Sequence, residues 1–230
     1  MEIGNLDLSR PLTAETVAAL RRVLLDYPVL IFRGQSLSKD AQAAFSAQFR
    51  ELEGHIGKLS DGSIFPLVHT LTNLDGAGNV INMDVAKLNY FWHTDKSYHA
   101  VPSFVTILHA LAVPPEGGDT QFSNARMAYA ALSSVMKARL EGLTMAHDWV
   151  ASRLNSGTSP ATKEQKQERP PVSHPLVRTH PVTGEKSLYL GVHVSHIEGM
   201  ERAESTALLA ELTRHIGEER FPYTHRWRVG

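Results

Sequence analysis

The sequence predicts a mainly β fold with flanking helices, of the sandwich or jelly-roll type. Short apolar runs of strand length are separated by turns rich in glycine and proline, and helical segments are inserted among them. The strands and helices do not alternate regularly, so a parallel sheet built from strand–helix–strand units is disfavoured. A chain of 230 residues can bury a substantial core, and we expect a single domain over residues 1–230.

Helical spacing of apolar residues and β-rich runs define the expected elements. Thr13 can cap the first helix, with Glu15 in its first turn, where a negative charge is favourable. A polar stretch at 152–171 is predicted to be a mobile loop or lid. In chain order, we expect helices over 13–26, 38–49, 123–132, 133–140 and 201–216, and strands over 27–32, 67–74, 104–112, 120–122, 176–180 and 187–194.

Composition narrows the classes of function. The formal net charge is -1, which offers no electrostatic reason for a nucleic-acid partner. The longest apolar runs have strand length, so no membrane association is expected. The chain contains no cysteine, which excludes disulfide, thiolate-zinc and iron–sulfur chemistry and suits a cytoplasmic protein. The chain contains twelve histidines and many carboxylates, so a metal site in it would use nitrogen and oxygen ligands.

The sharpest motif is Trp92-His93-Thr94-Asp95. In an extended segment, the side chains of His93 and Asp95 lie on the same face. An imidazole nitrogen and a carboxylate oxygen could then bind one metal ion. A histidine and an aspartate two residues apart can equally be solvent-facing or hydrogen-bonded to each other, so the spacing alone leaves both interpretations open.

A second motif is Gly117-Gly118-Asp119-Thr120. It has the composition of a β-turn in which Asp119 hydrogen-bonds its own backbone. The hydroxyl of Thr120 could also donate a hydrogen bond to the carboxylate of a small bound acid. The spacing does not choose between these interpretations.

Taken together, these motifs resemble the TauD/TfdA family, the taurine and 2,4-dichlorophenoxyacetate dioxygenases that depend on Fe(II) and 2-oxoglutarate. Residues 92–95, Pro102, Pro114-Pro115 and 117–120 follow one another in the order and spacing of that family. The similarity covers nearly the whole chain. The stretch 195–199 looks closer to the phenoxyacetate branch than to the taurine branch.

The resemblance implies a double-stranded β-helix, or jelly roll, that hydroxylates a small anionic substrate of aryloxyalkanoate or sulfonate type and releases succinate and CO2. It implies that His93 and Asp95 are two of three iron ligands and that Thr120 contacts the far carboxylate of 2-oxoglutarate. It assigns no side chain as a catalytic acid or base. Substrate contacts are expected from Asn89, Tyr90, Lys58, Lys87 and His193.

One departure from the family pattern leaves alternatives open. In the family, the segment 226–230 would be followed by a distal iron-binding histidine and by an arginine that binds 2-oxoglutarate, whereas the given sequence ends at Gly230. The expectation is that residues 1–230 alone are inactive and that a longer form is active. The alternatives are a non-catalytic binding relative on the same fold and a cupin-like metal enzyme without 2-oxoglutarate. The oligomeric state, including a homo-oligomer, stays open.

Overall fold

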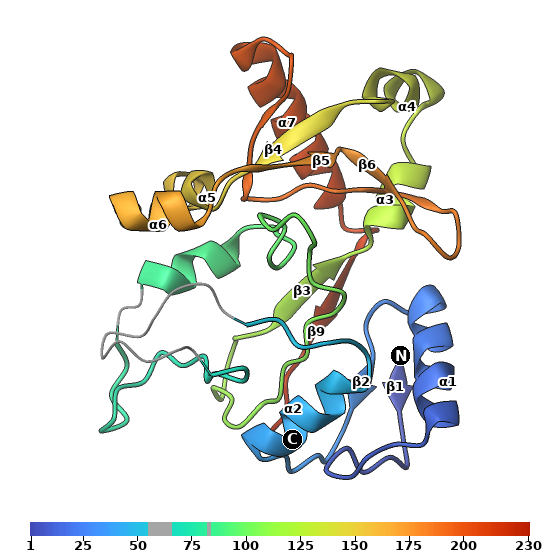
Figure 1. Cartoon of the computed structure of the whole chain (residues 1–230), viewed down its shortest axis with the longest axis vertical. Coiled ribbons are helices and arrows are strands. Elements are labelled where there is room, and N and C mark those ends of the chain that lie inside the picture. The colour runs from blue at the N-terminus through green and yellow to red at the C-terminus, as the bar shows by residue number, and fades with distance from the viewer. Residues whose placement is uncertain (55–65, 82–83) are drawn as a thin grey trace. The chain divides into compact units, whose positions relative to one another are not determined.

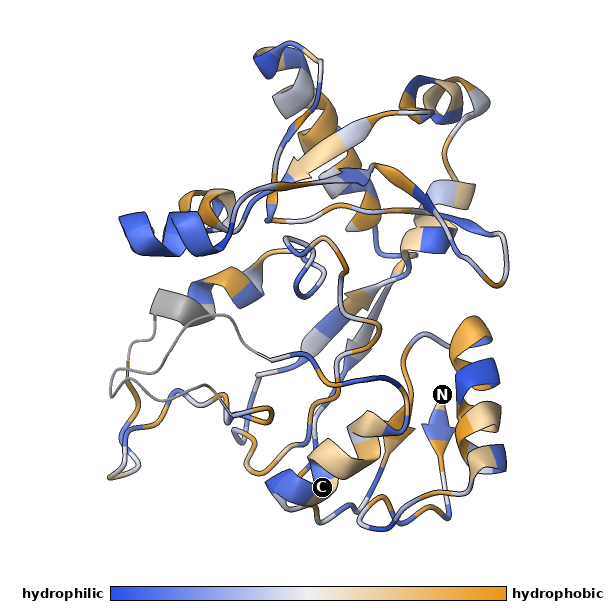
Figure 2. Cartoon of the chain, viewed as in Figure 1, coloured by the Kyte–Doolittle hydropathy of each residue, from blue (hydrophilic) through white to orange (hydrophobic). Residues whose placement is uncertain are grey.

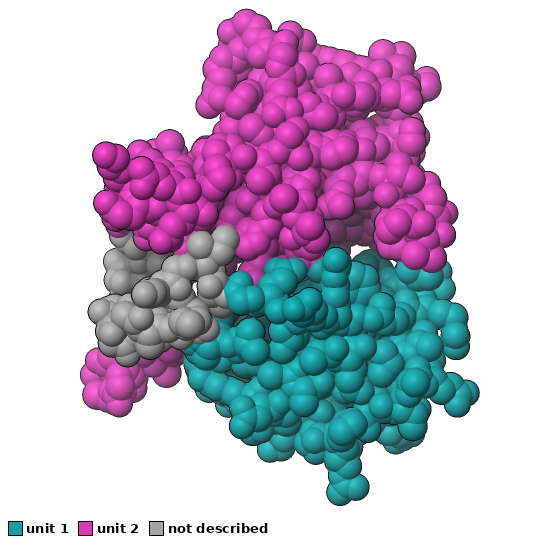
Figure 3. All heavy atoms as spheres, in the orientation of Figure 1, with its two compact units in different colours: residues 1–70, 104–122, 223–230 teal, residues 71–103, 123–222 magenta. Residues whose placement is uncertain are grey.

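The described chain forms two compact units. The computed structural model describes residues 1–54, 66–81 and 84–230. Unit 1 comprises Met1–Thr70, Phe104–Phe122 and Tyr223–Gly230, and unit 2 comprises Leu71–Ser103 and Ser123–Pro222 (Figure 3). Each unit is assembled from separated stretches of sequence, so neither is a continuous domain, and the single domain over 1–230 stays a prediction.

Unit 1 contains two capped helices and a short parallel sheet. The sheet pairs β1 (Glu2–Ile3) with β2 (Ile31–Phe32). Helix α1 (Ala14–Asp26) begins where Thr16 N–H donates to the hydroxyl of Thr13, as the capping pattern predicted. Helix α2 (Lys39–Ala47) begins in the same way at Ser38. The buried core of this unit consists of Leu8, Val17, Leu20, Phe45 and Phe49.

Strands β3 (Thr120–Ser123) and β9 (Pro222–His225) pair with each other, and most of their residues belong to unit 1. The strand predicted at 120–122 is therefore confirmed. Its partner β9 was not predicted, because residues 222–225 mix polar and aromatic side chains and show no apolar alternation.

Unit 2 is built around a three-stranded antiparallel sheet. Strand β4 (Thr144–His147) lies between β5 (Val172–Pro175) and β8 (Val194–Ile197). Helix α7 (Arg202–Ile216) contacts β8 and buries Leu208 and Leu212 in the core. The amphipathic helix predicted over 201–216 is thus confirmed.

The remaining elements of unit 2 surround this core. A hairpin joins β6 (Val177–Thr179) to β7 (Lys186–Leu188) in antiparallel register. Helices α5 (Trp149–Asn155) and α6 (Lys163–Glu168) lie at one end of β4 and β5 (Figure 1). The other described helical segments of this unit are the 3-10 helix η1 (Asp84–Tyr90), α3 (Ala125–Ala130) and α4 (Ser134–Leu140).

The polar stretch 152–171 is partly helical and not one continuous loop. It includes the end of α5 and the whole of α6, which has a capping box between Thr162 and Gln165. Helix α6 contains no buried residue, and Figure 2 shows it as almost entirely hydrophilic. The mobility of this stretch as a lid stays a prediction.

Three predicted strands differ from the structure. Residues 104–112 form no strand, and Phe104, Leu108 and Leu111 are exposed. The run 67–74 contributes only an isolated bridge between Leu74 and Val80. The strand predicted over 27–32 is reduced to its last two residues. Apolar composition favours extended backbone, but a strand also needs a neighbouring strand, and none of the described sheets includes residues 104–112.

The hairpin prediction is correct for its first strand and too long for its second. Within 187–194, strand β7 ends at Leu188, and Val194 already belongs to β8 in the other sheet. The chain leaves the hairpin through Gly191, whose φ of +145° is rare for residues with a side chain. Small sheets with flanking helices are nevertheless observed, as expected. Across the described residues, no helix is both long and apolar enough to cross a bilayer.

Candidate metal and substrate site

The side chains of His93 and Asp95 meet in unit 2. Nε2 of His93 lies 3.3 Å from Oδ1 of Asp95. The segment is not part of a strand, and a turn begins at Asp95, so the two side chains converge without regular strand alternation. Lys96, the second residue of this turn, has a φ of +52°. The pairing that the motif predicted is therefore present at interaction distance.

The orientation of His93 leaves Nε2 directed towards Asp95. Nδ1 of His93 lies 2.8 Å from the carbonyl oxygen of Phe91 and donates to it, because a carbonyl can only accept. This contact assigns the Nδ1–H tautomer to the neutral ring and leaves the Nε2 lone pair available for a metal ion. The hydrogen bond to Asp95 raises the pKa of His93, and burial opposes it.

The chemistry of this pair fits a metal centre. An imidazole nitrogen and a carboxylate oxygen are two of the three donors of the two-histidine, one-carboxylate sites that bind Fe(II). Both side chains are partly exposed, at 23% and 47%, so an ion can reach them. Among the described residues, no third histidine, aspartate or glutamate joins them in a metal-binding group.

His193 lies beside this pair. Its ring is edge-on to the ring of His93, with centroids 6.2 Å apart. Oγ of Ser97 is 3.2 Å from Nδ1 of His193, and the ring of Tyr98 packs 4.9 Å from it. Burial lowers the pKa of His193 to about 4, so the ring is neutral near pH 7. The structure thus brings His193 together with His93 and Asp95, and it adds Ser97, which no motif of the sequence indicates.

The other residues predicted to contact the substrate lie on η1 or outside the described residues. Lys87, Asn89 and Tyr90 lie on η1, and all three are exposed. Tyr90 has 87% of its surface accessible, so its ring fills no core. Lys58 lies outside the described residues. The roles of these four side chains in substrate binding stay predictions.

Thr120 lies at the start of β3 in unit 1. Its hydroxyl accepts a hydrogen bond of 2.9 Å from the indole nitrogen of Trp227. The ring of His225 stands edge-on to Trp227, with centroids 4.5 Å apart. Because the hydroxyl already accepts from Trp227, its own proton stays available to donate to a carboxylate.

A buried cluster of polar rings in unit 2 was not predicted. His147, His174 and Tyr189 lie within 5.0 to 5.5 Å of one another, measured between ring centroids. His147 is 1% exposed, and neither of its ring nitrogens has a hydrogen-bond partner in the described structure. Burial lowers its pKa to about 3. The only signal in the sequence was the abundance of histidine, because His147 and His174 meet through the pairing of β4 with β5, and Tyr189 reaches them from the end of β7.

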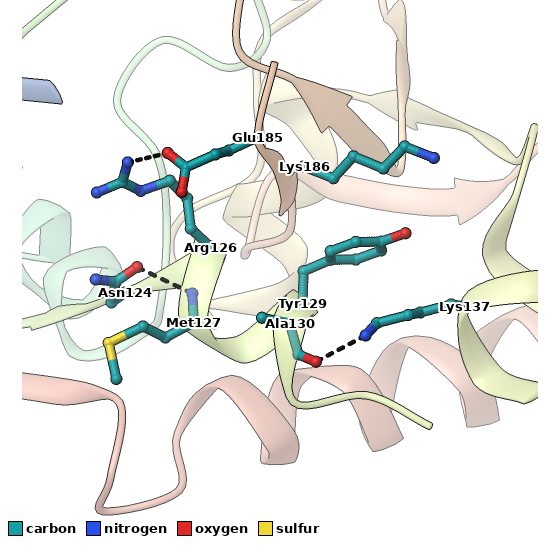
Figure 4. Close-up of a pocket in the computed structure, with 8 residues that line it drawn as sticks. All are labelled: Asn124, Arg126, Met127, Tyr129, Ala130, Lys137, Glu185 and Lys186. Atoms are coloured by element: carbon teal, nitrogen blue, oxygen red, sulfur yellow. Dashed lines mark hydrogen bonds and ion pairs between the residues drawn. The ribbon is translucent and has the colours of Figure 1, made fainter. Parts of the chain in front are cut away.

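A surface hollow in unit 2 lies apart from the predicted residues. Its volume is about 460 Å³, and Arg126 pairs with Glu185 at 2.5 Å on its wall (Figure 4). None of the side chains predicted for metal, 2-oxoglutarate or substrate lines it. The lining residues are Asn124, Arg126, Met127, Tyr129, Ala130, Lys137, Glu185 and Lys186.

Comparisons with known proteins identify the family. The model of the family "Taurine catabolism dioxygenase TauD, TfdA family" matches residues 2–230. The chain is 37% identical to the alpha-ketoglutarate-dependent 2,4-dichlorophenoxyacetate dioxygenase of Cupriavidus pinatubonensis, over 99% of this chain and 82% of that protein. It is 30% identical to an alpha-ketoglutarate-dependent sulfate ester dioxygenase of Pseudomonas putida, over 99% of this chain and 74% of that protein.

A solved structure agrees with this match. The crystal structure of AAD-2 in complex with Mn(II) and N-oxalylglycine is similar with a TM-score of 0.91 and 32% sequence identity. The similarity covers 99% of this chain and 82% of that one. The resemblance found in the sequence is therefore confirmed: the chain belongs to the TauD/TfdA family of dioxygenases, oxidoreductases that depend on Fe(II) and 2-oxoglutarate.

Proposed function

We propose that this protein hydroxylates a small aryloxyalkanoate anion, with conversion of 2-oxoglutarate to succinate and CO2, and that His93 and Asp95 hold the Fe(II). The observation that carries the proposal is the approach of His93 Nε2 to within 3.3 Å of Asp95 Oδ1. It occurs in a chain that is 37% identical to a 2,4-dichlorophenoxyacetate dioxygenase. When bound, the iron and the co-substrate supply the oxidising chemistry.

The side chains of this protein orient the reactants. The hydrogen bond from His93 Nδ1–H to Phe91 fixes the tautomer and the direction of the ring. In unit 1, the hydroxyl of Thr120 accepts from Trp227, and its own proton would be available to hold the far carboxylate of 2-oxoglutarate when the co-substrate is bound. That carboxylate is ionised near pH 7, so the hydrogen bond is charge-assisted.

The neighbours of the metal pair suit an anionic aromatic substrate. His193 is neutral and held at Nδ1 by Ser97, so it can contribute a directed hydrogen bond without adding a charge. The exposed side chains of Asn89 and Tyr90 can provide further polar and aromatic contacts. Lys87 and Lys58 are cations whose charge complements a carboxylate. These five side chains form the proposed substrate-binding set.

A sulfate ester or sulfonate is the second candidate substrate. The observation that favours it is the 30% identity with a sulfate ester dioxygenase. The same lysines and the same neutral histidine could bind a tetrahedral sulfur oxyanion, so a direct comparison of substrates must decide. An anionic head group is common to both candidates.

The proposed architecture is a jelly roll, and the TM-score of 0.91 with AAD-2 supports it. We place the protein in the cytoplasm because its chain contains no cysteine that an oxidising compartment would pair. We propose small molecules as its ligands, and a net charge of -1 offers no attraction for nucleic acid.

The decisive experiment measures succinate formation from 2-oxoglutarate with Fe(II) and ascorbate, using matched aryloxyalkanoates, alkyl sulfates and sulfonates. Substrate-dependent succinate is expected with phenoxyacetates from a form extended beyond residue 230, and is expected to disappear from that form in His93→Ala and Asp95→Ala. His69→Ala removes an exposed histidine of unit 1 and is the matched control. Succinate that depends on sulfate esters alone supports the second candidate. Turnover that survives His93→Ala would contradict the assignment of the metal ligand.

A further inference from the structure

The backbone of residues 191–194, the Gly191 turn, passes directly against His93. A Cβ atom at position 191 would lie 2.8 Å from Cα of His93 and 2.9 Å from the carbonyl oxygen of Trp92. Non-bonded atoms do not approach so closely, and both of these atoms belong to the main chain, so neither can rotate away. The φ of +145° at Gly191 excludes ordinary side chains independently.

We infer that Gly191 is a positioning residue for His93, and that the Gly191 turn sets the location of this ligand relative to Asp95. The inference rests on the proposed role of His93 and Asp95 as metal ligands. Its physical basis is contact between two main-chain segments, which only glycine permits at this separation.

Hydrogen bonds attach the turn to the metal-binding motif. Val192 N–H donates to the carbonyl oxygen of Trp92 over 2.9 Å, next to the point of closest approach. Val194 N–H donates to the carbonyl oxygen of Gly191 over 2.9 Å and closes the turn. A displacement of Gly191 is therefore transmitted directly to the peptide bond that precedes His93.

The opposite side of the turn is held by β4 and α5. Asp148 N–H, at the end of β4, donates to the carbonyl oxygen of His193 over 2.7 Å. The side-chain amide of Asn155 donates to the carbonyl oxygens of Val192 and Val194, at 2.8 and 3.3 Å. These hydrogen bonds fix the turn between the sheet of unit 2 and the motif. The turn therefore resists displacement when an atom added at Gly191 presses against the main chain of His93.

The turn also presents His193 to His93. The two rings stand at 88° with centroids 6.2 Å apart. One short segment therefore supports the main chain of the proposed metal ligand and supplies the side chain proposed to contact the substrate. An atom added at Gly191 is expected to alter both at once, whereas a Cβ at Gly184, in the turn of the hairpin, would meet nothing within 4 Å.

The test compares Gly191→Ala with Gly184→Ala. Gly184 also has a positive φ, of +72°, but a Cβ there would meet nothing within 4 Å. Both variants therefore strain the backbone, and only Gly191→Ala pushes on His93. Two signals are followed in the wild-type chain and the variants: the imidazole nitrogen resonances of His93 without metal, by NMR, and the affinity for Co(II), by absorption titration.

Gly191→Ala is expected to shift the His93 resonances and to weaken Co(II) binding about ten- to a hundred-fold, the usual effect of disturbing the support of a metal ligand. Gly184→Ala is expected to change neither. The inference is overturned when Gly191→Ala leaves both signals at their wild-type values, or when Gly184→Ala changes them equally.

Asn155→Ala decides the question when Gly191→Ala does not fold. This variant removes two hydrogen bonds from the Gly191 turn without adding an atom. A shift of the same His93 resonances with a smaller loss of Co(II) affinity supports the inference, and unchanged signals overturn it. Failure of the proposed function is separate: a wild-type chain that binds no Co(II) contradicts the metal assignment, and the metal-free His93 resonances still decide the role of Gly191.

Discussion

His193 holds a fixed place beside His93, edge-on at 6.2 Å between ring centroids, because Ser97 hydrogen-bonds its Nδ1 and Tyr98 packs against its ring. Its side chain is 3% exposed and neutral near pH 7. A buried neutral imidazole so close to the proposed metal ligand suits a contact with substrate. This relationship leads to the first prediction.

Replacing His193 by phenylalanine is expected to weaken substrate binding more than metal binding. Phenylalanine keeps the ring and its packing on Tyr98 but removes both hydrogen-bonding nitrogens. Loss of one hydrogen bond to a charged substrate corresponds to about 1.5–3 kcal/mol, or about ten- to a hundred-fold in KM. Steady-state succinate assays give KM, and Co(II) titration gives metal affinity. A large loss of Co(II) affinity with unchanged KM would show that His193 serves the metal.

Replacing Asp95 by asparagine is expected to lower the pKa of His93 and to weaken metal binding. The hydrogen bond that the protonated ring of His93 donates to Asp95 is the largest influence that raises the pKa of His93. A neutral amide of the same shape removes the negative charge, so the imidazolium loses its partner and releases its proton at lower pH. NMR titration of His93 in the metal-free protein measures the shift. Asp26→Asn, an exposed substitution at the end of α1, is the control and should leave His93 unchanged.

The buried ring of His147 is expected to make the protein less stable in acid. Burial lowers its pKa to about 3 in the folded state, whereas the ordinary value is 6.5. As the pH falls from 6.5 towards 3, His147 binds a proton in the unfolded chain but stays neutral in the folded chain. The free energy of unfolding therefore decreases. His193 contributes in the same direction over a narrower range, since its pKa is lowered to about 4.

His147→Phe is expected to flatten this pH dependence, because phenylalanine can retain the stacking on Tyr189 without titrating. Urea unfolding at a series of pH values gives the free energy of unfolding for the wild-type chain and the variant. His69→Phe, at an exposed position, should keep the wild-type slope. Equal slopes for His147→Phe and wild type would mean that the buried ring is not the source of acid sensitivity.

Helix α6 is expected to open more readily than the core of unit 2. None of its residues is buried, so few apolar contacts oppose opening. Thr162→Ala removes a cap that stabilises a helix by about 0.5–2 kcal/mol and should increase amide hydrogen exchange in α6 further. Ser133→Ala, at the cap of α4, tests the same chemistry elsewhere. Exchange in α6 as slow as in α7 would contradict a mobile lid.

The sequence by itself determined the helix starts and the proposed metal pair, because both depend on neighbours within a few residues. Thr13 and Ser38 cap α1 and α2 through hydrogen bonds to residues three positions later. His93 and Asp95 are two residues apart, and the local turn that begins at Asp95 brings their side chains to 3.3 Å. The motifs of the TauD/TfdA family are likewise short stretches of sequence that can be identified without a structure.

Only the tertiary structure decided which β-rich segments pair and what surrounds the pair. Residues 104–112 have strand composition but belong to none of the described sheets, whereas 222–225 lack the pattern and pair with β3. The cluster around His147 and the contact of Gly191 with His93 join residues far apart in the chain. Such contacts follow from strand register and main-chain packing, which depend on the whole fold and leave no periodic signal in any one segment.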